Sequence, residues 1–293
     1  MGAITVRPDI YEKHRSLFGE KTVNGRPVSV EDLIEQLTRD TRDEFRTLLS
    51  ARHAFQDQVG RRERSYGFLA PDTKIADADG HTTTVRDIRQ GMLDGFFHRK
   101  TPHAWRLNPS VPIPADTMKP GLEGTGPAID IGMAMGALNT GAASWMWDWE
   151  DAGGDYRDQL YQAWENLRDL LAHAWNGKAY THPTKRDGGK PRQYTIDLPP
   201  EQWPTIFHRV PGLHLHNRQI ALDGEQVPAI IPALLFHAIS NYDTQKKNGS
   251  GVYYYIPKIE TWQEARLVAS LLKRVEEALG LPRGSLKVKM LNE

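Results

Sequence analysis

Apolar residues recur at helical spacing in the first third of the chain. Between residues 29 and 64 they stand three or four positions apart, which predicts an amphipathic helix packed against a larger body. Ser29 lies three residues before Asp32 and is the expected cap of this helix. The apolar positions of the predicted helix are Leu33, Ile34, Leu37, Phe45, Leu48, Leu49 and Phe55.

Residues 66–127 follow a different pattern. Asp79-Gly80 is a turn signal between two short strand-like runs, so a hairpin is expected there. The second half of the segment is rich in Pro and Gly, which predicts a linker or a wrapping segment. The three glycines between residues 121 and 126 suggest a phosphate loop, but Pro127 follows at once. No strand is expected before them and no Lys-Ser or Lys-Thr pair completes the motif, so we predict no phosphate loop.

From about residue 128 onward, strand-like and helical patterns alternate. The apolar strand-like runs are SWMWDWEDA (144–152), PTIFHRVPGLHL (204–215), GVYYYIPKIE (251–260) and SLKVKMLNE (285–293). The helical runs are 129–141, 157–175, 227–247 and 261–280, the last with Thr261 and Glu264 as a capping box and Gly280 as its stop. This alternation predicts right-handed βαβ units with a parallel sheet. It does not separate a (β/α)8 barrel from an open doubly wound sheet, although no glycine fingerprint for dinucleotides follows any strand.

Each predicted strand ends in polar or charged residues, and Pro257 is expected to stop the strand that begins near residue 251, just before Lys258. The polar and charged residues are Asp148, Glu150 and Asp151; Arg209; Lys258 and Glu260; and Asn292 and Glu293. Because the carboxyl ends of parallel strands meet at one edge of the sheet, these side chains are expected to line an active site.

Arg209 lies among apolar residues, where a guanidinium is stable only beside an anion. It either forms a structural salt bridge with a neighbouring acid or binds a substrate carbonyl or carboxylate. The acids around Glu150 are either plain loop residues or part of a Mg²⁺ site. His214 and His216 could form a metal pair, but no third ligand is evident. An arginine among several acids, with Glu293 added, fits proton abstraction next to a carbonyl.

Composition narrows the class of protein. The 293 residues contain 37 Lys plus Arg and 37 Asp plus Glu, so zero net charge favours neither a nucleic-acid nor a membrane-surface partner. No apolar run is long enough for a membrane span, and the N-terminus lacks the apolar stretch of a secretory signal. The absence of cysteine excludes disulfides, thiolate metal sites and cysteine nucleophiles. A cytoplasmic protein is expected.

Several motifs from residue 124 to residue 293 resemble the malate synthase family. They are GTGPAIDIGMAMGALNTGAASWMWDWEDA, FHRVPGLHL, ALDGEQVPAIIPALLFHAISN, GVYYYIPKIETWQEARLVASLL and LGLPRGSLKVKMLNE. Their order and spacing follow the family, whereas the first 120 residues resemble it only around RDEFRTLLSAR. The resemblance implies an α/β fold, a partial TIM (β/α)8-type barrel preceded by an α-helical N-terminal clasp. The expected domains are the clasp and linker (1–115) and an incomplete barrel (116–293).

The resemblance also implies a chemistry. The family condenses acetyl-CoA with glyoxylate and water to malate and CoA in the glyoxylate cycle, using Mg²⁺. Arg209 matches the arginine that stabilises charge on glyoxylate and on the enolate oxygen. Glu293 matches a metal-ligating glutamate, Glu150 an acid near the metal that acts through water, and Asp151 an acid that orients Arg209.

The chain departs from the family at Pro211, where the family has a second arginine, and at Ala152, where it has a serine. The family's chains continue past this point with further barrel strands and the general-base aspartate. We therefore expect this chain to be inactive alone. Two alternatives remain: an acyl-CoA lyase of the citrate lyase β-subunit type, which cleaves malyl-CoA or citramalyl-CoA, and a non-catalytic half-barrel that needs a complementary C-terminal chain or self-associates.

Overall fold

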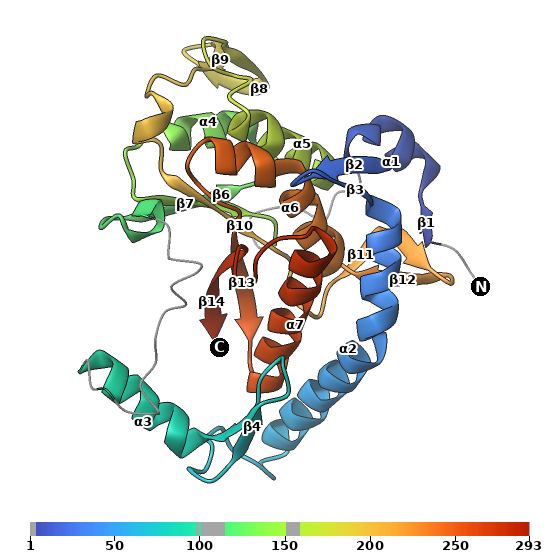
Figure 1. The fold of residues 1–293 in the computed structure, drawn as a ribbon. Helices are drawn as coiled ribbons and strands as arrows, with labels where there is room; N and C mark the ends of the chain where they lie inside the picture. The colour runs from blue at the N-terminus through green and yellow to red at the C-terminus, as the bar shows by residue number, and fades with distance from the viewer. Residues whose placement is uncertain (1–3, 98–99, 101–114, 151–158, 293) are drawn as a thin grey trace.

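A five-stranded parallel sheet forms the centre of the molecule (Figure 1). The computed structural model describes residues 4–97, 100, 115–150 and 159–292. Across the sheet the strands lie in the order β14-β13-β10-β7-β6. Their bounds are β6 (Glu123–Pro127), β7 (Ser144–Asp148), β10 (Thr205–Arg209), β13 (Tyr253–Ile259) and β14 (Lys287–Asn292). Strands of this sheet that follow one another along the chain are therefore neighbours within it. A barrel has this order, whereas the strand order of a doubly wound sheet reverses at one point.

Helices in the connections cover the outer face of this sheet. They are α4 (Ile131–Leu138), α5 (Gln159–Leu171), α6 (Ile230–Lys247) and α7 (Trp262–Ala278). The capping box predicted for α7 is present, because Thr261 accepts from the backbone N–H of Glu264 and Glu264 accepts in return. The α/β fold class, a parallel barrel-type sheet with a helical N-terminal region, is confirmed. The largest fully buried side chains of the sheet and its covering helices include Trp147, Tyr161, Tyr253, Tyr254 and Phe236.

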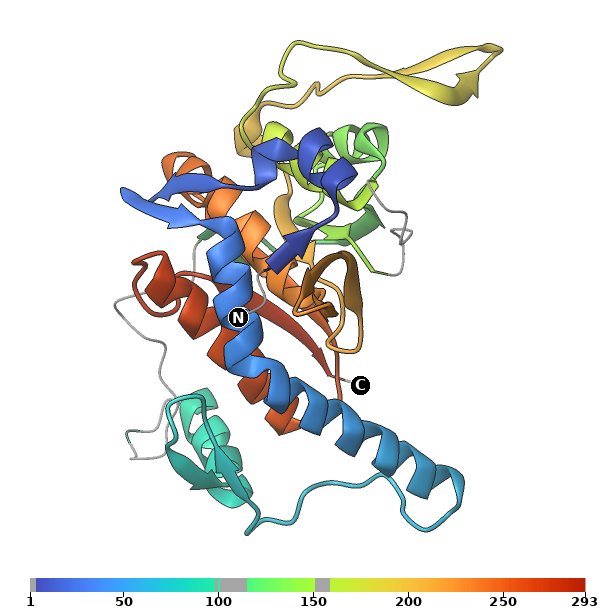
Figure 2. The same cartoon turned by 90° about the vertical axis from the view of Figure 1, so that its right-hand side faces the viewer.

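The N-terminal region wraps around this body. Its helices and strands are β1 (Ile4–Val6), α1 (Pro8–Lys13), β2 (Glu20–Val23), β3 (Arg26–Ser29), α2 (Val30–Gly60), β4 (Lys74–Ala76), β5 (Thr82–Thr84) and α3 (Val85–Phe96). The long helix α2 runs alongside α7 (Figure 2), and the ion pair Arg274–Asp40, at 2.6 Å, joins the two. Ser29 caps α2 as predicted, and the β4–β5 hairpin forms around the predicted turn. Strand β1 pairs antiparallel with β11 (His216–Leu222), so chain segments far apart in sequence share one small sheet.

Strand β6 lies within the segment that was predicted to be a linker or wrapping segment. That prediction is wrong for residues 123–127. Glycine and proline are poor strand formers, so the pattern concealed the strand. The glycines are needed because Trp145 of β7 lies over β6: a Cβ at Gly126 would approach its ring to 2.5 Å, and one at Gly124 to 2.8 Å.

Two further hairpins were not predicted. Strands β8 (Tyr180–Asp187) and β9 (Lys190–Tyr194) form one that projects from the body (Figure 2), and β11 with β12 (Glu225–Pro228) forms the other. The β8–β9 hairpin lies in the connection that enters β10, and the β11–β12 hairpin lies in the connection that leaves it. Neither hairpin belongs to the central sheet.

The central sheet is strongly curved. In a flat sheet, four strand spacings of about 4.8 Å would separate β6 from β14 by about 19 Å. Instead Lys289 of β14 forms an ion pair with Glu123 of β6, and its ammonium lies 4.2 Å from the ring centre of Phe207 on β10. Two side chains span the whole sheet, so the two edge strands approach each other across the inner face.

Candidate functional site

The carboxyl ends of three neighbouring strands bring four charged side chains together. Arg209 ends β10, Asp148 and Glu150 stand at the end of β7, and Lys258 lies near the end of β13. Arg209 is in register with Asp148 on one side and with Tyr255 on the other. We call Asp148, Glu150, Arg209 and Lys258 the charged cluster. It lies where a barrel-type sheet binds its substrate.

Arg209 is held by two carboxylates. Its Nη1 lies 3.2 Å from Oδ2 of Asp148 and its Nη2 lies 2.7 Å from Oε2 of Glu150. Only 7% of the residue is exposed, so the two anions provide the compensation that a buried guanidinium needs. The salt bridge considered from the sequence is therefore present. It also fixes the plane of the guanidinium at the strand end, which substrate binding by Arg209 would require.

Glu150 faces donors from β10, from the loop after β10 and from β13. Besides the contact with Arg209, its Oε1 accepts from the backbone N–H of Gly212 at 3.1 Å, and Nζ of Lys258 lies 3.4 Å from the same oxygen. A Cβ at Gly212 would come within 2.8 Å of this oxygen and within 2.8 Å of the His214 ring. Glycine is therefore the residue that allows the backbone after β10 to approach Glu150 so closely.

The outer face of β10 carries a group of buried rings that sequence reasoning did not single out. His208 packs against Trp149, Tyr254 and His237 of α6, with ring centres 4.9 to 6.0 Å apart. Burial lowers the pKa of His237 to about 3, and burial together with the neighbouring His237 lowers the pKa of His208 well below 6.5. Both rings are therefore neutral at physiological pH. The apolar run around FHR indicated that His208 would be buried, but only the fold brings His237 to it.

Two of the predicted site residues, Asp151 and Glu293, lie outside the described residues, and their roles stay predictions. His214 and His216 are both exposed, and the pair is not part of a three-ligand group among the residues that the structure describes.

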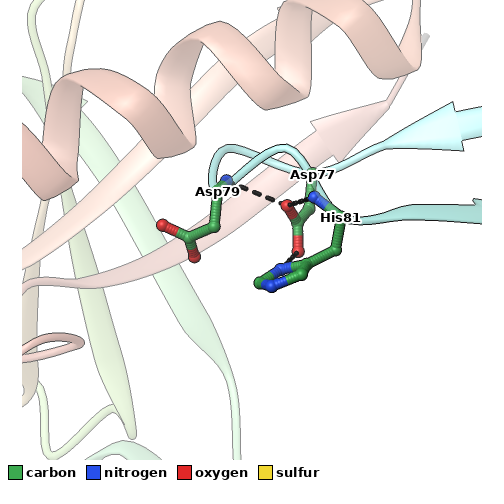
Figure 3. Close-up of side chains that lie close together, drawn as sticks. All are labelled: Asp77, Asp79 and His81. Atoms are coloured by element: carbon green, nitrogen blue, oxygen red, sulfur yellow. Dashed lines mark hydrogen bonds and ion pairs between the residues drawn. The ribbon is translucent and has the colours of Figure 1, made fainter.

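The group of three potential metal ligands that the described residues do form lies elsewhere, at the β4–β5 turn (Figure 3). It comprises Asp77, Asp79 and His81, all exposed. Asp77 accepts from the backbone N–H groups of Asp79 and His81, which orders the turn. Asp79 accepts hydrogen bonds from Lys273 of α7 and from Arg283 in the loop after α7, so this carboxylate joins the hairpin to both. The same hydrogen bonds lower the pKa of Asp79 to about 2.

The acids of the charged cluster bind N–H donors. Oδ1 of Asp148 accepts from the backbone N–H of Glu150, and its Oδ2 contacts Arg209. Both oxygens of Glu150 also face donors. This donor set fits anchors for Arg209 and does not by itself fit a direct magnesium site.

Fold and site together define a class: an α/β protein built on a barrel-type parallel sheet, with an arginine–carboxylate cluster at the carboxyl ends of its strands. Residues 205–293 match the family model "Malate synthase, TIM barrel domain". Malate synthase A of Escherichia coli is 33% identical over 212 residues, 71% of this chain and 37% of that protein. The Myxococcus xanthus malate synthase is 33% identical over 187 residues (62% and 31%), and the glyoxysomal malate synthase of Ricinus communis 31% over 210 (69% and 34%).

The chain is thus similar to malate synthases over about two thirds of its length. It spans about a third of the length of the curated relatives that it matches. No helix among the described residues has the length and apolarity to cross a membrane.

Proposed function

We propose that this chain contributes the Arg209 site of a malate synthase-type acyltransferase. In that reaction the methyl carbon of acetyl-CoA loses a proton and forms a C–C bond to the aldehyde carbon of glyoxylate. Water then hydrolyses the thioester, which gives malate and CoA. The observation that carries the proposal is Arg209, oriented at the end of β10 by Asp148 and Glu150.

Arg209 would stabilise negative charge on the substrate oxygens. A guanidinium has five N–H donors, so it can bind two carboxylates and still bind a carbonyl or enolate oxygen. Such preorganised donors lower the barrier because they need no rearrangement as charge develops. Asp148 and Glu150 would hold Arg209 in place, with Asp151 as a further orienting acid. Glu293 would ligate Mg²⁺, which supplies Lewis-acid polarisation of the aldehyde when bound.

Glyoxylate binding tests the assignment directly. We expect the purified chain to bind glyoxylate with Mg²⁺ in isothermal titration calorimetry, and Arg209→Met to remove that binding. Arg209→Lys keeps the charge but not the planar fork, and is expected to bind weakly. Arg192→Met, on the exposed β9 strand, is the matched control and should bind normally. Unchanged binding in Arg209→Met would refute the assignment.

Activity of the isolated 293-residue chain is a separate question. We propose that it does not catalyse the condensation alone, because the matched relatives are about three times as long as the aligned region. Release of free thiol from acetyl-CoA that depends on both glyoxylate and Mg²⁺ would overturn this proposal.

The alternative reaction is cleavage of malyl-CoA or citramalyl-CoA by a citrate lyase β-type lyase. The test is to incubate the chain with either compound and to measure acetyl-CoA. Release of acetyl-CoA would favour the lyase over the malate synthase reaction. A half-barrel completed by a complementary chain or by self-association is the other alternative. Light scattering tests self-association, because a stable monomer of 33.2 kDa would count against it. The cytoplasmic location stays a prediction.

A further inference from the structure

Lys258 has a backbone conformation that lysine rarely adopts. Its φ is +56°, in the left-handed region that normally belongs to glycine or asparagine. Strand β13 has an irregularity at this point: Ile256 pairs with Met290 and Ile259 with Asn292. Three steps along β13 therefore match two steps along β14, so β13 contains one extra residue, a bulge. The strand continues to Ile259, so the prediction that Pro257 stops it is wrong.

The bulge decides where the side chain of Lys258 points. Tyr255 is in register with Arg209 and shares the inner face of the sheet. Strict alternation would then turn Lys258 to the outer face, toward the helices. Instead its ammonium lies 3.4 Å from Oε1 of Glu150 in the charged cluster. A locally strained backbone thus delivers a cation to the substrate side of the sheet, and strain of this kind gathers at functional sites.

Arg52 of α2 holds this bulge. Its Nη2 donates to the backbone carbonyl of Lys258 at 2.9 Å, and its Nε donates to Glu264 at 2.9 Å. The side chains of Arg52 and Glu264 are 7% and 1% exposed, so the contact is well shielded from water. Glu264 also accepts from the backbone N–H of Glu260 at 2.7 Å, which fixes the chain just after the bulge. The N-terminal helix therefore sets the conformation of Lys258 from outside the barrel-type sheet.

Lys258 is the more accessible cation of the charged cluster. Its side chain is 29% exposed, whereas those of Arg209 and Glu150 are 9% and 3% exposed. Lys258 therefore presents more of its side chain to solvent than Arg209 does. An ammonium carries three donors and can therefore bind more than one carboxylate.

We propose that Lys258 binds the carboxylate of a small 2-oxo acid substrate, and that Arg52 is the positioning residue that holds it there. This inference rests on the proposed function and adds a separate subsite to it. Arg209 would face the carbonyl oxygen of the substrate, and Lys258 its carboxylate.

The test compares glyoxylate with its methyl ester, which keeps the aldehyde and lacks the carboxylate charge. With Mg²⁺ present, we expect the chain to prefer glyoxylate by roughly tenfold to a hundredfold in calorimetric Kd, the effect of one charge-assisted contact. Lys258→Gly should lose this preference. Because glycine adopts a positive φ without strain, this variant should melt at or above the temperature of the wild type. Lys258→Arg should retain part of the preference, and Lys190→Met, at the exposed start of β9, should retain all of it.

The role of Arg52 is tested by a double-mutant cycle. Arg52→Met should reduce the preference for glyoxylate in the wild-type background and have no further effect on it in the Lys258→Gly background. A reduction that persists in both backgrounds would show that Arg52 does not act through Lys258.

Two results would overturn the carboxylate subsite, and they point to different causes. Wild-type binding of glyoxylate with an unchanged preference in Lys258→Gly would refute the Lys258 assignment alone. Failure of the wild-type chain to bind either compound would refute both this subsite and the proposed function.

Discussion

The two buried histidines behind Arg209 should make the fold sensitive to acid. His208 and His237 are almost fully shielded from water, with 0% and 2% exposure, and their rings are in edge contact at 4.9 Å. In the folded chain both stay neutral down to low pH, because burial lowers their pKa values. In the unfolded chain they protonate near pH 6.5. Below pH 6.5 the unfolded state therefore binds more protons than the folded state, and stability falls as the pH falls.

The size of this effect at pH 5 depends mainly on the unfolded pKa. Because burial lowers the folded pKa of His237 to about 3, this ring destabilises the fold over about 1.5 pH units at about 1.4 kcal/mol per unit, which is about 2 kcal/mol. His208 acts in the same direction. A loss of about 2 kcal/mol is already a large part of the 5–15 kcal/mol that is typical of folded proteins. At pH 7.5 the contribution is close to zero.

Urea denaturation at pH 7.5 and at pH 5.0 measures this difference. In His237→Asn the new side chain cannot protonate, although its oxygen can still accept from Asn241, the partner of His237 at 2.9 Å. Between pH 7.5 and pH 5.0, we expect the free energy of unfolding of the variant to fall by about 2 kcal/mol less than that of the wild type. This difference does not depend on how stable the variant is at pH 7.5. His216→Asn, on the surface of β11, is the control and should follow the wild type. An equal loss in His237→Asn and wild type would refute the reasoning.

Two further predictions concern the site and the sheet. Glu150→Gln removes one of the anions that hold Arg209 and should destabilise the chain by about 3 kcal/mol in urea denaturation; a loss below about 1 kcal/mol would mean that Asp148 alone suffices. Gly126→Ala places a methyl group against the ring of Trp145 and should cost about 1–3 kcal/mol of stability by the same measurement. Gly136→Ala, in α4 with open space around its Cα, is the matched control and should be neutral or stabilising; equal effects of the two glycine substitutions would contradict the packing argument.

Regular periodicity predicted most of the central fold. The alternating strands and helices after residue 128 gave the parallel sheet, and side-chain chemistry at their boundaries gave the Ser29 cap and the Thr261–Glu264 capping box. Prediction from the sequence failed where tertiary contacts override the local preference of the residues for a helix, strand or turn. Strand β6 was hidden by glycines that are required by Trp145, and the end of β13 was misplaced because a bulge accommodates Pro257.

The site was predicted in part for the same reason. Arg209 and Glu150 could be paired from the sequence, since parallel strands align their carboxyl ends. The contribution of Arg52 was missed, because it comes from a helix some 200 residues earlier, as its separation of 206 positions from Lys258 shows. One signal was present: Leu48, Arg52 and Phe55 share the helical spacing of the apolar face, so Arg52 was a charged residue on a buried stripe.

The ion pair between Lys289 and Glu123 has a consequence for the order of folding. Its two residues are 166 positions apart, and they belong to the last and first strands of the central sheet. During synthesis, Glu123 leaves the ribosome long before its partner, so the first strand must wait until 166 further residues have been made. Contacts of such large sequence separation slow folding and leave early segments exposed to other partners. The curvature of this sheet is thus a late event, completed only when β14 has been made.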